Sequence, residues 1–394
     1  MTDASILKKP TYFNAIDGLR LLASVNVVLF HLEYIGGLND LGGSPGWLFR
    51  LIKGPAFHAS LFFILGGFIF ATKFAPKIET FKQRDFLKKR FIELYPLHLV
   101  TTLTMAALYL IRRWGTGEID IPKLLYSLFM HLSFLWSFCP LGAENLNTPS
   151  WALSAMFLCY LLFDPLLKWS LTIKKRSMVM VYIVLFFIPL IMWGHLYALI
   201  GSPHDMYQFF HGFAPVRFFE FGMGVLLARL FILKQTRTTA GRPYDEKTAT
   251  PFIRRHFVSI SCDAVMLLAF CLIFFNLSSQ FRDTPQKLWF SYHVTMLPLY
   301  MAAIYAASVE KGIFARIFST PAIKKLGRTS FYPYLIHIPL MSIITLFCER
   351  VLGYKKFLHS PINIAAFMIA LYGCSYLYVY AIRNKRRARK NATG

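Results

Sequence analysis

Arg20 and His31 lie eleven residues apart in one apolar segment, and their side chains could bind an anion and transfer a proton. At about 100° per residue, eleven steps of an α-helix return to within roughly 20° of the starting face and advance by about 16 Å. Asp17 and Ser24 fall on the same face. Imidazole titrates near neutral pH and is therefore suited to acid–base chemistry. The spacing predicts a helix whose polar face looks into a protein-lined cavity.

A second interpretation of this segment stays open. Asp17 and Arg20 could simply mark the boundary between membrane and water, where charged side chains are commonly found. His31 taken alone could be a packed residue that hydrogen-bonds to a neighbour. The common face of Arg20 and His31 favours the functional interpretation.

The composition indicates an integral membrane protein. The chain has 394 residues, of which 56% are hydrophobic and 16% charged, and its mean hydropathy is +0.48. Such a sequence is too apolar for a soluble domain. Segments of about 20 apolar residues, enough to cross a bilayer as a helix, recur from end to end. We predict an all-α bundle of about ten transmembrane helices in a single domain over residues 1–394. The expected spans are 16–36, 55–73, 91–111, 150–170, 178–200, 217–234, 258–279, 288–308, 330–349 and 361–382.

The distribution of basic residues predicts the orientation of these spans. With both termini in the cytoplasm, the inward segments hold thirty of the forty-three Lys and Arg residues and the outward segments hold ten. This bias satisfies the positive-inside rule. An eleventh span over the apolar stretch 121–139 would reverse the orientation of every later segment and place basic segments outside. We therefore expect an outward-facing or re-entrant helix there. The chain is thus expected in the cell (inner) membrane, with a basic cytoplasmic tail at 383–394.

The net charge of +24 follows from this orientation, because the basic residues adjoin anionic lipid at the cytoplasmic surface. We therefore expect membrane lipid, and no nucleic acid, among the partners. Six cysteines are scattered without a CxxC pair or metal-ligand spacing, so neither disulfides nor a metal site are expected. The first apolar run is too long for a cleaved signal peptide and is expected to be a retained span.

One glycine pair, one pair of opposite charges and one further histidine stand out within the apolar segments. Gly66 and Gly67 lie in the middle of a span, which suits close approach of two helices. Arg217 and Glu220 are three residues apart, so they can pair on one helix face, either as a structural ion pair or as a substrate contact. His337 is a second intramembrane histidine, and taken alone it is more often a packed residue than a functional one.

In sequence order, six blocks of this chain resemble the membrane-bound acyltransferase family 3. The resemblance extends from residue 11 to about residue 380. It rests on Ile16-Asp17-Gly18-Leu19-Arg20 with Leu29-Phe30-His31, Phe62–Ile69, Phe86–Pro96, Ser150-Trp151-Ala152-Leu153-Ser154 with Tyr160–Phe163, Arg217–Glu220 with Gly224, and Leu326-Gly327-Arg328 with Ser330, Tyr334, His337 and Pro339.

The resemblance implies an enzyme that moves an acyl group, expected to be acetyl, from cytosolic acyl-CoA to a hydroxyl of a cell-envelope polysaccharide such as lipopolysaccharide, or of a glycolipid or lipid-linked sugar. No bound cofactor is implied, because acyl-CoA (acetyl-CoA) is the donor substrate. Arg20 and His31 are implied to be catalytic, and we add Asp17 as the partner of Arg20. The implied donor site is Lys88, Lys89 and Arg90, whose charges suit CoA phosphates. Residues of the other blocks are candidates for the acceptor site or pocket, namely Ser150, Trp151, Ser154, Arg217, Glu220, Arg328, Ser330, Tyr334 and His337.

The chain departs from the family pattern at two positions. Glu93 stands where a second cation is usual, and it would repel CoA phosphates unless it pairs with Lys89 or Arg90. The residues after Ser154 are uncharged where the family usually carries glutamate. Larger relatives continue into an extracytoplasmic hydrolase-like domain, so we expect this chain to act alone or to pass its product to a separate protein.

A transporter is the alternative from another functional class, since many spans and intramembrane ionisable residues also fit a permease for a glycan, an acyl donor or a small polar solute. Against it, the two halves of the sequence show no convincing internal repeat. Covalent transfer of the acyl group by the purified protein distinguishes the two.

Overall fold

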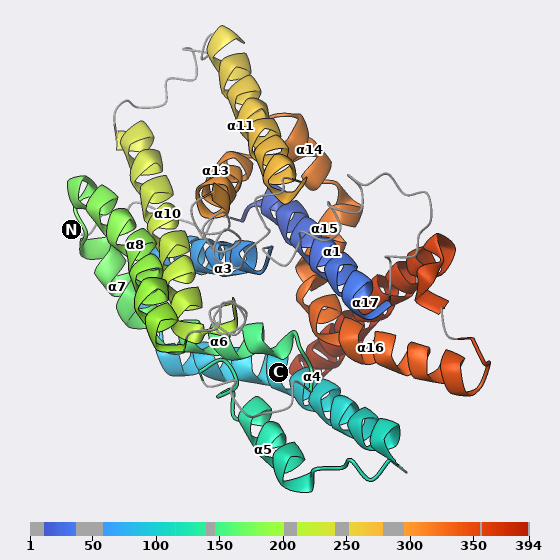
Figure 1. Cartoon of the computed structure of the whole chain (residues 1–394). Coiled ribbons are helices and arrows are strands. Elements are labelled where there is room, and N and C mark those ends of the chain that lie inside the picture. Colours follow the sequence, from blue (N-terminus) through green and yellow to red (C-terminus); the bar gives the residue numbers. More distant parts are fainter. Residues whose placement is uncertain are drawn as a thin grey trace.

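The structure, a computed structural model, describes residues 12–36, 58–114, 116–138, 146–200, 211–240, 252–278, 295–354 and 357–392. Every regular element in these ranges is helical, which confirms the all-α prediction (Figure 1). The helices are α1 (Asn14–Gly36), α3 (His58–Phe74), η4 (Ala75–Thr80), α4 (Gln83–Arg113), α5 (Ile121–Leu132), α6 (Ser150–Leu161), α7 (Phe163–Thr172), α8 (Lys175–Ile200), α10 (Ala214–Ala240), α11 (Phe252–Ser278), α13 (Leu297–Ser308), α14 (Ile313–Phe318), α15 (Pro321–Thr329), α16 (Phe331–Arg350), η6 (Phe357–His359) and α17 (Pro361–Ala392).

Five of the described helices are long and apolar enough to cross a membrane, and they begin at Asn14, Ala59, Gln83, Phe331 and Pro361. A sixth span results if α6 and α7 are counted together. Three shorter apolar stretches do not meet this criterion: 177–189 within α8, 257–273 within α11, and 297–308, which is α13. The described residues therefore contain five or six candidate spans, and the number of ten stays a prediction. Residues 55–57, 279 and 288–294 of the expected spans, and 393–394 of the tail, lie outside the described residues.

The segments expected at 121–139 and 150–170 take more complex forms than single helices. α5 is only twelve residues long, and Asp120 caps its N-terminus by accepting a hydrogen bond from the Lys123 backbone N–H at 2.9 Å. A helix of this length is too short to span a bilayer, in agreement with the prediction for this stretch. The expected span 150–170 is bent by 55° between α6 and α7, so this stretch forms either one broken span or a re-entrant pair of helices.

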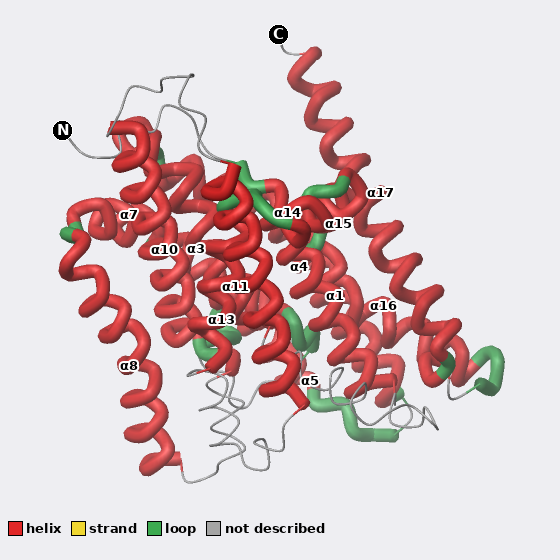
Figure 2. The backbone as a smooth tube through the Cα atoms, turned by 90° about the horizontal axis from the view of Figure 1, so that it is seen from above, coloured by secondary structure: helices red, strands yellow, loops and turns green. Residues whose placement is uncertain are grey.

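Most long helices run roughly side by side, with α8 at one edge of the bundle and α17 at the other (Figure 2). α3 and α10 make the most extensive helix–helix contact and lie at the centre of the largest apolar core. Glycines permit this close approach, as small residues generally do between membrane helices. A Cβ atom on Gly67 would lie 2.0 Å from the Phe221 carbonyl oxygen, and one on Gly224 would lie 2.0 Å from that of Ile64. The close approach predicted for the Gly66–Gly67 pair is thus confirmed at Gly67.

Alanine at Gly67 or Gly224 is expected to destabilise the protein by about 1–3 kcal/mol, because the clash is with backbone and cannot be relieved by a side-chain rotation. Gly373→Ala in α17 is the matched control, since a Cβ there meets nothing within 4 Å. At such an open helical position alanine is neutral or stabilises by about 0.5–1 kcal/mol. The unfolding temperatures of the three variants in detergent test this, and an unchanged value for both Gly67→Ala and Gly224→Ala would contradict the packing described.

Candidate active site

The structure brings His31 of α1 and His337 of α16 into contact. His31 Nδ1 lies 3.2 Å from His337 Nε2, and the ring centroids are 4.9 Å apart. His337 is fully buried, whereas His31 is only partly so. From the sequence, His31 and His337 are two separate candidates, because 306 positions lie between them.

The surrounding carbonyl groups assign the protons of this histidine pair. His31 Nδ1 is 2.9 Å from the Val27 carbonyl oxygen and His337 Nδ1 is 3.1 Å from that of Pro333. A carbonyl can only accept, so each Nδ1 carries the hydrogen of its neutral ring. The Nδ1–H of His31 is then shared between Val27 and the unprotonated Nε2 of His337. His31 Nε2 is consequently left as a lone-pair nitrogen, which is the form a general base requires.

Aromatic side chains of α16 itself and of α3 and α6 pack near this pair. Tyr334 is buried one turn before His337, with ring centroids 6.2 Å apart, and it also contacts Phe62 of α3 at 5.9 Å. Trp151 of α6 packs on His211 at 4.8 Å. His211, which the sequence reasoning missed, interacts electrostatically with His31. Burial, together with the Arg217 guanidinium and His31, lowers the pKa of His211 well below its usual value.

Arg217 and Glu220 form a completely buried ion pair, as their spacing predicted. Arg217 Nη1 is 2.7 Å from Glu220 Oε1 and 2.6 Å from Ser60 Oγ. Its Nε and Nη2 both donate to the His211 carbonyl oxygen, at 2.9 and 2.7 Å. The guanidinium carbon lies 5.4 Å from the centroid of the Trp151 ring. These contacts favour the structural interpretation, because the pair ties α3, α6 and α10 together.

At the opposite end of α1, Asp17 pairs with two arginines. Its carboxylate is 3.6 Å from Arg20 Nη1, as predicted, and 3.2 Å from Arg328 Nε of α15. The Tyr12 hydroxyl also donates to Asp17 and lies 2.6 Å from Arg328 Nε. Partial burial and this hydrogen bond raise the pKa of Tyr12 to about 12. Gly327 allows the close approach of α15, because a Cβ there would lie 2.0 Å from the Asp17 carbonyl oxygen.

The serines singled out by the sequence have structural contacts. Ser154 Oγ donates to the Phe134 carbonyl and accepts from the Ser137 backbone N–H at 3.3 Å, which holds the turn after α5 against α6. Ser150 and Ser330 are buried, and neither hydroxyl oxygen has a hydrogen-bond partner among the described residues. The Ser330 carbonyl accepts from Ser24 Oγ at 2.9 Å, which links α16 to the polar face of α1.

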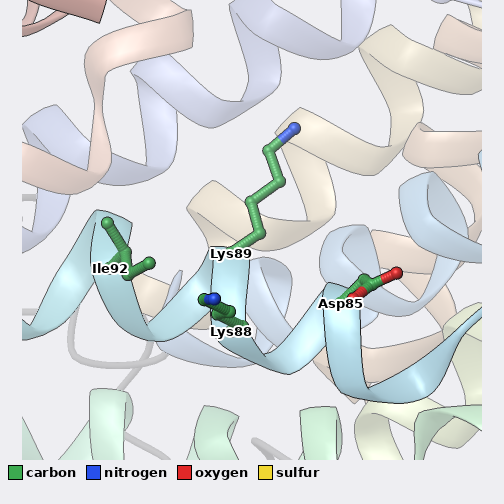
Figure 3. A pocket seen from close by; sticks show the side chains of 4 residues that line it. All are labelled: Asp85, Lys88, Lys89 and Ile92. Carbon is green, nitrogen blue, oxygen red and sulfur yellow. The ribbon is translucent and has the colours of Figure 1, made fainter.

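The three basic residues proposed for the donor separate into two groups on α4. Lys88 and Lys89 line a surface pocket of about 300 Å³ together with Asp85 and Ile92. All four residues belong to one stretch of α4, and the Lys89 side chain extends away from the helix (Figure 3). Arg90 instead turns inward, where it pairs with Glu93 at 2.9 Å. The pairing of Glu93 that the sequence required is therefore present.

Arg90 also lies over an aromatic cluster at the junction of α3 and α4. Its guanidinium carbon is 5.5 Å from the centroid of Phe70 and 5.9 Å from that of Phe86. Lys73, at the C-terminal end of α3, interacts electrostatically with both Lys89 and Arg90. Sequence reasoning missed Lys73, because its proximity to α4 depends on the turn through η4.

Comparison with known proteins places these residues in one family. The model of the acyltransferase domain of the acyltransferase 3 family matches residues 13–380. A protein of Streptomyces mycarofaciens named "Acyltransferase MdmB" is 30% identical over 167 residues, or 41% of this chain and 40% of that protein. A Staphylococcus aureus (strain COL) protein named "Putative O-acetyltransferase" is 23% identical over 366 residues, or 86% of this chain and 52% of that protein.

The matches thus span about half the length of these relatives or less. No solved structure matches the chain. The family match covers the histidine pair, the two-arginine cluster at Asp17 and the basic stretch of α4 in one continuous alignment. By this match, the chain belongs to the acyltransferase 3 family.

Proposed function

We propose that this protein is an O-acyltransferase that moves an acyl group, acetyl in the simplest case, from acyl-CoA to a hydroxyl of a cell-envelope glycan or lipid-linked sugar. The observation that carries the proposal is the histidine pair, in which the contacts of Nδ1 leave His31 Nε2 as a base in a chain of the acyltransferase 3 family.

The pair supplies the two proton transfers that acyl transfer requires. His31 Nε2 removes the proton of the acceptor hydroxyl, and the oxygen attacks the thioester carbonyl carbon. The C–S bond then breaks, and the departing thiolate takes the proton from the imidazolium, which yields the ester and free CoA. His337 Nε2 accepts the Nδ1–H of His31 throughout, so it keeps the ring oriented and stabilises the positive charge that forms on it.

Arg20 and the basic end of α4 are proposed to hold the donor. Arg20 lies three turns along α1 from His31, about 16 Å away, so it contacts the CoA arm and not the histidine itself. Asp17 directs Arg20 by the ion pair at 3.6 Å. Lys88 and Lys89, which line the pocket, and the neighbouring Arg90 suit the phosphates of CoA. Lys73 adds a cation from α3 beside Arg90, whose own charge is partly balanced by Glu93.

We further propose that the protein lies in the inner membrane with both termini in the cytoplasm, and that the donor enters from the basic side and the acceptor from the side of Trp151 and His211. The test is transfer of a labelled acetyl group from acetyl-CoA to a saccharide or lipid-linked sugar by the purified protein. Mass spectrometry of envelope glycans from a deletion strain identifies the acceptor. Movement of the donor across vesicles without covalent transfer would favour a transporter instead.

Replacement of Lys88, Lys89 and Arg90 together by glutamine is expected to raise the KM for acyl-CoA by at least tenfold and to leave the acceptor KM nearly unchanged. The reason is the loss of charge-assisted bonds to phosphate, each worth about 1–3 kcal/mol. Initial rates at varied concentrations of each substrate measure this. Lys174→Gln with Lys175→Gln, at the start of α8, is the control for a general loss of basic charge. Equal donor KM values in the triple variant and the control would remove α4 from the donor site.

A further inference from the structure

Pro339 interrupts the hydrogen-bond ladder of α16 next to His337. In an α-helix the N–H of each residue donates to the carbonyl four residues earlier, and proline has no N–H. Pro339 therefore leaves the Leu335 carbonyl without its helical donor. Leu335 is fully buried, so water does not replace the missing bond.

A side chain from a distant part of the chain supplies the missing donor. Asn147 Nδ2 lies 3.3 Å from the Leu335 carbonyl oxygen, across 188 positions of sequence. Asn147 is fully buried in the segment that leads into α6. Its backbone carbonyl oxygen accepts a hydrogen bond from the Ser150 backbone N–H at 2.9 Å. The segment that precedes α6 therefore lies against α16 at Leu335.

The turn of α16 that carries His337 is thus held through two of its backbone carbonyl groups. The Pro333 carbonyl accepts from His337 Nδ1 and fixes the ring. The Leu335 carbonyl, two residues further along, is held by Asn147. Loss of the second contact would leave an unsatisfied carbonyl in a buried turn, and the backbone would shift to reach another donor. Such a shift moves His337 relative to His31, whose 3.2 Å contact depends on the separation of α1 and α16.

We propose that Asn147 is a positioning residue for the histidine pair: by donating to the carbonyl that Pro339 leaves open, it holds the turn that places His337 against His31. The inference rests on the proposed function, since it assigns to Asn147 a role in the acid–base step. Asn147 does not touch the acceptor or the donor in this proposal, so its loss affects kcat and not substrate binding.

The structure offers a way to replace the contribution of Asn147 from within the helix. Alanine at position 339 has the N–H that proline lacks and can donate to Leu335. We therefore compare Asn147→Leu, which removes the donor and keeps the branching and the number of non-hydrogen side-chain atoms, in the natural chain and in the Pro339→Ala variant. A double-mutant cycle of this kind isolates the coupling between the two positions. Asn147→Ala repeats the cycle with a smaller side chain.

Asn147→Leu in the natural chain is expected to lower kcat by about tenfold with both KM values nearly unchanged, and to shift the pH dependence of kcat, because His31 loses an aligned partner. In the Pro339→Ala background the same substitution is expected to change kcat by less than threefold. Asn363→Ala is the matched control: this asparagine also donates to a backbone carbonyl, that of Phe357 at 2.8 Å, but away from the histidines. Its kcat and pH profile are expected to be unchanged.

Equal losses of kcat in both backgrounds would overturn the inference, as would a raised acceptor KM in both, which would place Asn147 in the acceptor site. A lower unfolding temperature with unchanged kcat and pH profile would overturn it too, since Asn147 would then be purely structural. His31→Ala keeps this result separate from the proposed function. An inactive His31→Ala together with an uncoupled Asn147 would reject the positioning role alone, whereas an active His31→Ala would reject the proposed function.

Discussion

Replacement of His31 by alanine is expected to reduce the rate of acyl transfer by about 10²–10⁴-fold, the usual contribution of a general base. The physical reason is that an alcohol is a weak nucleophile until its proton is removed, and His31 Nε2 is the nitrogen that the contacts of the pair leave unprotonated. The acyl-CoA affinity is expected to stay unchanged, because the proposed donor contacts are Arg20, three turns away on α1, and the basic residues of α4. Rates of transfer and equilibrium binding of acyl-CoA by the same purified variant measure the two effects separately.

The companion variant His337→Ala distinguishes the base from its partner. It is expected to retain more activity than His31→Ala, since the Val27 carbonyl still accepts the Nδ1–H of His31 at 2.9 Å. Near-normal turnover in His31→Ala, with full activity loss in His337→Ala, would reverse the assignment of the two rings. Near-normal turnover in both would exclude the pair from the reaction.

Removal of Glu220 is expected to destabilise the fold by about 3–5 kcal/mol, because it leaves the Arg217 charge fully buried without its ionic partner. Glu220→Leu tests this by the unfolding temperature in detergent. The double variant Arg217→Met with Glu220→Leu is expected to be considerably more stable than Glu220→Leu alone, since an apolar pair carries no uncompensated charge. If the single and double variants unfolded at the same temperature, the ion pair would not be the origin of the effect.

The ion pair of Lys168 with Asp164 on α7 provides the control for this prediction. Its separation of 2.8 Å is nearly the same as that of the buried pair, but the Lys168 side chain is 58% exposed. Exposed pairs contribute about 0–1 kcal/mol, because water already solvates both groups. Asp164→Ala is therefore expected to change the unfolding temperature little. A loss as large as that of Glu220→Leu would show that burial does not set the energy of these pairs.

Local interactions could be predicted from the sequence because they depend only on helix periodicity. The pairs Asp17–Arg20, Arg90–Glu93 and Arg217–Glu220 all have the i,i+3 spacing that places two side chains on one helix face, and all three are present. The all-helical class and the membrane character follow from composition, since long apolar segments satisfy their backbone only as helices. The number of spans does not follow in the same way. α10 contains Arg217, Glu220 and Arg229, and only the packing around it makes those charges tolerable.

The contacts that make a site were decided by tertiary structure alone. His31 meets His337, Asp17 meets Arg328, and Asn147 meets Leu335 across 306, 311 and 188 positions of sequence. No periodicity links such residues, because side chains distant in the chain come together only through the packing of whole helices. The sequence determined which residue types line each helix face. Tertiary packing determined which of these faces meet. Glycines let α3 approach α10 closely, and α16 lies against α1, so that two separate histidines become one acid–base pair.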